Sequence, residues 1–172
     1  DWTGRIARVK GNELMKLKDE RLSELEKIIS INGFDLDYSS ESLQMLNDFV
    51  CSELEEYAPK LNKSMPAFNE YAVLPYFRSL AIDCTLYLGD ILIKNDPDNL
   101  KWDVYKSSQK RLLHKFYPTV TKGETKSIFA SSIHLYFVQY LGGFNNNKKR
   151  FIDIYTRSCH ELNIDIERTN DE

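Results

Sequence analysis

The stretch AIDCTLYLGDILIKNDPDNLKW, residues 81–102, carries the side chains best suited to acting together in chemistry. Asp83 and Asp90 are seven residues apart, so on a helix they project from nearly the same side, with Tyr87 between them. Paired carboxylates suit metal binding or general acid–base catalysis. Two helical turns separate them by ~10.8 Å, which is too far to share one cation without a third ligand. The same spacing also fits the solvent-facing stripe of a buried helix, with Asp90 and Lys94 as an i,i+4 ion pair.

A glycine inside the same predicted helix indicates a packing contact. Gly89 costs ~1 kcal/mol there relative to alanine, and such a glycine usually reflects the close approach of another part of the chain. The polar turn NDPDN, residues 95–99, folds the following segment back toward the helix end. We therefore expect Trp102 to cover the helix at Gly89.

Motifs of the common enzyme and metal-binding classes are missing from the sequence, which has no GxGxxG, Walker, GxSxG or HExxH pattern. Its three histidines, at 114, 134 and 160, are far apart. Cys159 and His160 are adjacent and would point to different helix faces, so they cannot form a nucleophile–base pair by themselves. We predict no catalytic residues, no metal site and no cofactor.

Composition and charge exclude several classes of protein. With 172 residues, 42% hydrophobic residues, ten Tyr and nine Phe, the chain fits one folded domain and is too apolar for disorder. The net charge of −3 argues against nucleic-acid binding, and no apolar run approaches the ~20 residues of a membrane helix. Cys51, Cys84 and Cys159 lack CxxC spacing and fall at positions predicted to be packed, which favours buried thiols and a cytoplasmic setting.

Hydrophobic periodicity predicts a single α+β domain that is predominantly helical. We expect five or six helices and a small antiparallel sheet of two or three strands. Residues 127–141 fit either a helix or a strand by composition, and their length favours a helix. The expected helices cover about 13–30, 41–57, 64–71, 75–94, 127–141 and 147–162, and the strands about 100–105 and 112–120. The expected domain covers 13–166, between an N-terminal arm 1–12 and a polar tail 167–172.

Two short motifs resemble those of small uncharacterised bacterial domains, in which a helix ends in Tyr-x-Gly-Glu and a Trp-bearing strand follows. The resemblance covers about residues 34–105, and Asp90 stands where those domains have Glu. The resemblance implies an accessory domain, a group in which we expect some members to be immunity proteins. It implies no enzymatic activity. The matching residues are Tyr87, Gly89, Asp90 and Trp102 in the first motif and Asp37, Tyr38, Ser39, Ser42 and Leu43 in the second.

Small size, acidic net charge and the lack of a catalytic constellation favour a non-enzymatic protein-binding domain. Its most concrete form is a bacterial immunity protein that covers the basic surface of a cognate toxin. The alternative is a small enzyme or ligand-binding domain that uses Asp83, Tyr87, Asp90 and Trp102 in a pocket at the end of the central helix. The oligomeric state does not follow from the sequence. The acids expected to contact a partner protein are Asp35, Asp37, Glu53, Glu55 and Glu56, which equally fit ordinary solubilising charges.

Overall fold

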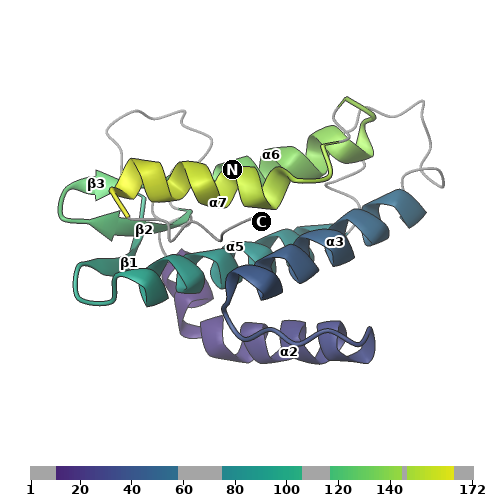
Figure 1. The fold of residues 1–172 in the computed structure, drawn as a ribbon, viewed down its shortest axis with the longest axis horizontal. Coiled ribbons are helices and arrows are strands. Elements are labelled where there is room, and N and C mark those ends of the chain that lie inside the picture. The colour runs from purple at the N-terminus through teal and green to yellow at the C-terminus, as the bar shows by residue number, and fades with distance from the viewer. Residues whose placement is uncertain (1–10, 58–74, 106–116, 145–146, 165–172) are drawn as a thin grey trace, which may run out of the picture.

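The computed structural model describes residues 11–57, 75–105, 117–144 and 147–164 (Figure 1). They form an α+β fold that is mostly helical, with a three-stranded antiparallel sheet, as the sequence predicts. Residues 11–16 are also helical and lead into the first labelled helix, so helical structure begins before the predicted start at residue 13. The predicted tail and the predicted helix 64–71 lie outside the described residues. The labelled elements are α2 (Lys18–Ile31), α3 (Ser40–Tyr57), α5 (Pro75–Asn95), β1 (Leu100–Val104), β2 (Pro118–Lys122), β3 (Thr125–Lys126), α6 (Phe129–Leu141) and α7 (Arg150–Leu162).

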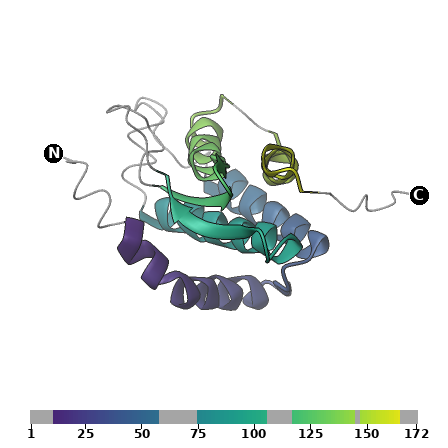
Figure 2. The same ribbon diagram turned by 90° about the vertical axis from the view of Figure 1, so that its left-hand side faces the viewer.

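Helix α5 is the centre of the fold. Helix α2 packs on one side of it, and α6 and α7 lie on the other side (Figures 1 and 2). The sheet packs against α5 close to the end of the helix from which β1 departs (Figure 1). Apolar side chains cover α5 almost all round, which is typical of a helix enclosed by the rest of a domain.

Local sequence signals explain where α3 begins. The Ser39 hydroxyl accepts a hydrogen bond from the Ser42 backbone N–H at 3.1 Å, so Ser39 caps the N-terminus of α3. The regularly spaced residues Leu43, Leu46 and Leu54 are all buried, as their helical periodicity predicts. This one face joins α3 to α6 and α7.

The sheet has the order β1-β2-β3, and Trp102 of β1 lies opposite Val120 of β2. Strand β2 begins at Pro118, inside the segment 112–120 predicted for the second strand, of which residues 112–116 lie outside the described part of the chain. Proline lacks a backbone N–H and is tolerated as the first residue of a strand. Gly123, with φ of +58°, lies in the turn between β2 and β3.

Two further expectations can be compared with the structure. Residues 129–141 form helix α6, which resolves the ambiguity of that segment in favour of a helix. The thiols of Cys51, Cys84 and Cys159 are buried and unpaired by disulfides. Among the described residues, no helix has the length and apolar character needed to cross a membrane.

Candidate functional site

Asp90 links three elements near the end of α5. Its Oδ1 accepts a hydrogen bond from Trp102 Nε1 of β1 at 2.7 Å, and its Oδ2 lies 2.5 Å from Lys18 Nζ of α2. Burial lowers the pKa of Lys18, but the hydrogen bonds to Asp90 and Asp19 outweigh that effect and leave it raised. The expected ion pair between Asp90 and Lys94 does not form. Asp90 is therefore part of a polar junction rather than of a solvent stripe.

Gly89 and Trp102 are in direct contact, as predicted. A Cβ atom added at Gly89 would lie 2.9 Å from Trp102 Cζ3 and closer still to Cζ2 and Cη2. The edge of the indole thus occupies the space that any other residue at 89 would need. The indole is half-buried and also packs against Phe129 of α6, with 6.2 Å between the ring centroids. Glycine at this position is explained by the approach of the tryptophan.

Asp83 is buried against α2 and does not face solvent, as a residue of a solvent-facing stripe would. The residue is only 9% exposed, and its Oδ1 lies 2.7 Å from Arg21 Nη2 of α2. The two groups form an ion pair between α2 and α5. Burial raises the pKa of Asp83 to about 6, and Arg21 only partly opposes it. The same guanidinium also donates to the Ser79 carbonyl and hydroxyl.

Tyr87 brings the two sequence motifs together in space. Its ring is fully buried and stacks on Tyr38 with 4.8 Å between centroids. Its hydroxyl oxygen accepts from the Tyr38 backbone N–H at 2.9 Å and lies 2.6 Å from the Ser42 hydroxyl oxygen. Tyr38 has φ of +64°, which is uncommon for a residue with a side chain, and these contacts hold it there.

The four predicted site residues therefore share a structural role. The polar atoms of Asp83, Tyr87, Asp90 and Trp102 bond to groups of α2, of β1 and of the connection between α2 and α3. These bonds fasten three segments to the central helix. Among the described residues, no group of three or more His, Cys, Asp or Glu side chains is arranged to hold a metal ion.

The predicted partner-binding acids fall into two separate groups. Asp35 and Asp37 lie exposed in the connection of residues 32–39. Hydrogen bonding from Ser39 lowers the pKa of Asp37. The second group lies at the far end of α3, because the helix rises ~20 Å between Ser40 and Glu53. The structure does not combine the two groups into one acidic surface.

The glutamates at the end of α3 have partners within the chain. Glu55 Oε1 lies 2.5 Å from Lys148 Nζ, and this pairing lowers the pKa of Glu55. Glu53 accepts a hydrogen bond from the Tyr76 hydroxyl at 2.6 Å, and Glu56 is exposed. Lys148 therefore neutralises part of this group.

The structure adds a surface that the sequence reasoning missed, which we call the outer face of α2. Glu20, Glu24 and Ile31 stand at i, i+4 and i+11, so they form one stripe along the helix. Lys27 and Ile28 lie beside it, and Ile31 is 85% exposed. The buried Leu22, Leu25 and Ile29 define the opposite face of α2, so the spacing was visible in the sequence, whereas the pairing of Lys18 and Arg21 with α5 was not.

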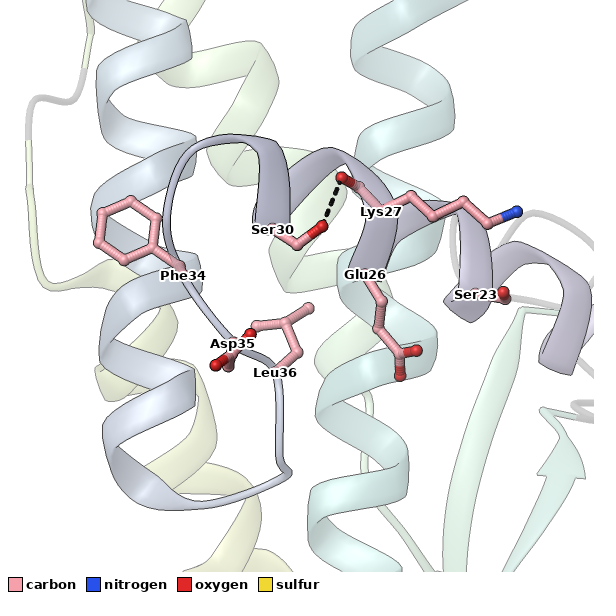
Figure 3. Close-up of a pocket in the computed structure, with 7 residues that line it drawn as sticks. All are labelled: Ser23, Glu26, Lys27, Ser30, Phe34, Asp35 and Leu36. Carbon is pink, nitrogen blue, oxygen red and sulfur yellow. Dashed lines mark hydrogen bonds between the residues drawn. The ribbon is translucent and has the colours of Figure 1, made fainter.

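A hollow of about 420 Å³ lies between α2 and the connection of residues 32–39 (Figure 3). It is open to solvent, and none of Asp83, Tyr87, Asp90 and Trp102 lines it. One predicted acid, Asp35, does. The lining residues are Ser23, Glu26, Lys27, Ser30, Phe34, Asp35 and Leu36.

Comparison of the chain with protein-family models, with curated proteins and with solved structures gives no match.

Proposed function

We propose that this chain is a protein-binding domain without a catalytic role, and that its partner binds the outer face of α2. The inward orientation of Lys18 and Arg21 carries the proposal. These two cations pair with Asp90 and Asp83 on α5. The solvent side of α2 consequently keeps its carboxylates while losing two of its positive charges.

Charge and apolar content both support a basic protein as the partner. Glu20 and Asp19 are exposed on or beside this face, Asp19 at 3.1 Å from Lys18 Nζ, and Glu24 pairs with Lys27 at 2.7 Å. Complementary charge speeds association and disfavours wrong partners. The exposed Ile28 and Ile31 add apolar surface that a partner would remove from water.

Toxin neutralisation is the most concrete form of this function. An acidic domain with a net charge of −3 can cover a basic toxin surface by direct contact, with no chemical step. The alternative of a small enzyme requires a concave site that contains Asp83 or Asp90. Neither residue lines the hollow, and no observation on the described residues favours that alternative.

The test is co-purification with the product of the gene encoded beside this one. We expect the wild-type chain to bind it and the Glu20→Lys/Glu24→Lys variant to lose at least tenfold in affinity. The matched control is Asp98→Lys/Glu124→Lys, which makes the same charge change at two exposed turn positions. Ile31→Glu provides an apolar counterpart at a residue that contributes no core packing.

Equal binding by the wild type and the Glu20→Lys/Glu24→Lys variant would refute the outer face of α2 as the interface. An equal loss of affinity in the control variant would show that the loss comes from the change in net charge and not from the outer face of α2. If the neighbouring gene product does not bind at all, the toxin-neutralising form of the proposal is wrong.

A further inference from the structure

The hollow beside α2 combines an apolar wall with an anionic rim. Phe34 and Leu36 are half-buried and pack against the core, so this wall is fixed in place. Glu26 and Asp35 contribute carboxylates, and Ser23 and Ser30 contribute hydroxyls. A volume of about 420 Å³ lies within the range of sites that bind ligands.

The cation that lines the hollow does not neutralise it. Lys27 pairs with Glu24 through a 2.7 Å contact, and its amine extends away from Leu36 in Figure 3. The carboxylate of Glu26 lies on the same side of α2 as Leu36 (Figure 3). It accepts one hydrogen bond, from the Tyr38 hydroxyl at 3.2 Å, and a carboxylate has acceptor capacity for several more.

We propose that this hollow receives a lysine or arginine side chain from the protein partner, an inference that rests on the proposed protein-binding function. Such side chains have an apolar stem and a cationic head, and they bury the stem while the head stays polar. Phe34 and Leu36 match the stem, and Glu26 and Asp35 match the head. The open shape suits a side chain presented from another protein's surface.

Other kinds of ligand fit the hollow less well. An anion would meet the carboxylates of Glu26 and Asp35, and the lysine that lines the hollow, Lys27, pairs with Glu24. A metal ion would need a closer cluster of ligands, and none occurs among the described residues. A basic side chain is the chemistry that satisfies both the wall and the rim.

The test is an NMR titration of the full ¹⁵N-labelled chain with a capped hexalysine peptide, with capped hexaglutamate as the negative control. We expect saturable shifts at the amides of Ser23, Ser30 and Leu36 with hexalysine alone. Glu26→Gln and Asp35→Asn should each weaken hexalysine binding about fivefold, the size of one exposed charge interaction.

The matched control for the charge is Glu124→Gln, which removes one exposed carboxylate from the turn between β2 and β3. It should leave the hexalysine affinity within twofold of the wild type. Melting temperatures of the three variants verify that each is folded. Shifts spread evenly over the surface, no saturable shift at the hollow, or an equal loss in the Glu124→Gln variant would each refute the subsite.

Repeating the partner co-purification with Glu26→Gln/Asp35→Asn separates the two proposals. If this variant binds normally while Glu20→Lys/Glu24→Lys does not, the subsite is wrong and the outer face of α2 remains the interface. If neither variant loses the partner, the outer face of α2 is not the interface and the subsite is refuted as well; if the wild type does not bind the partner at all, the proposed function itself fails.

Discussion

Replacing Gly89 with alanine should destabilise the protein when Trp102 is present and stabilise it when Trp102 is replaced by alanine. In the wild-type background the new Cβ would overlap the edge of the indole, within 2.9 Å of Cζ3 and closer to two neighbouring carbons. The ring is rigid and its Nε1 is held by Asp90 at 2.7 Å. It therefore cannot swing away without straining or breaking that hydrogen bond.

The magnitude follows from two opposing contributions. Displacing the ring costs about 3 kcal/mol, the scale of overpacking or of losing a hydrogen bond to a charged group. Exchanging glycine for alanine within a helix returns ~1 kcal/mol. Gly89→Ala should therefore lower the free energy of unfolding by about 2 kcal/mol. In a Trp102→Ala background the obstacle is absent, and the same change should raise it by about 0.5–1 kcal/mol.

Urea denaturation followed by far-UV circular dichroism of the four chains measures this double-mutant cycle. The coupling free energy should be about 3 kcal/mol. Trp102→Ala alone should cost about 2–4 kcal/mol, because the ring is half-buried and loses its hydrogen bond to Asp90. As a control, Ser52→Ala on exposed α3 surface should have the same small effect in both backgrounds. If Gly89→Ala stabilises the wild type, or has the same effect with and without Trp102, the close-contact explanation is refuted.

Three further positions test the polar contacts of α5 and the cap of α3. Asp83 has its pKa raised from 3.8 to about 6, so the folded state binds the extra proton between these values and this group's contribution to stability falls as pH rises through that window. Relative to the wild type, Asp83→Asn should thus gain up to about 3 kcal/mol between pH 4 and pH 7 in urea titrations; a change of the opposite sign would mean that pairing with Arg21 dominates. Tyr87→Phe removes the acceptor of the half-buried Tyr38 backbone N–H and the partner of the buried Ser42 hydroxyl, and should cost about 1–3 kcal/mol by chemical denaturation. An unchanged midpoint would contradict the hydrogen bonds assigned to Tyr87. Ser39→Ala should cost about 1 kcal/mol through loss of the α3 cap, whereas Ser39→Asp should retain most of the stability in thermal melts.

Several features could be derived from the sequence because they depend on neighbours along the chain. The cap at Ser39 and the spacing of Leu43, Leu46 and Leu54 define α3 through local hydrogen bonding and one apolar face. The contact of Gly89 with Trp102 was predictable for the same reason. The turn between α5 and β1 is short, so β1 must pack beside the C-terminal end of α5.

The partners of Asp83 and Asp90 depended on tertiary structure. Arg21 and Lys18 precede them by 62 and 72 residues, and nothing in the local pattern of α5 identifies which side α2 covers. Because α5 is apolar nearly all round, its few polar positions looked like a solvent stripe, whereas they mark the junction with another helix.

The charge that α2 offers to the proposed partner depended on the same long-range pairing between α2 and α5. Helical spacing places Lys18 and Arg21 on the same side of α2 as the buried Leu22, so the sequence already indicates which face of the helix turns inward. The tertiary structure supplies their partners: Asp90 and Asp83 of the distant helix α5 lie 2.5 and 2.7 Å from the two cations, while Glu20 and Glu24 face water. The sequence determines how much charge a helix carries, but the three-dimensional pairing of buried groups decides which charges a partner can reach.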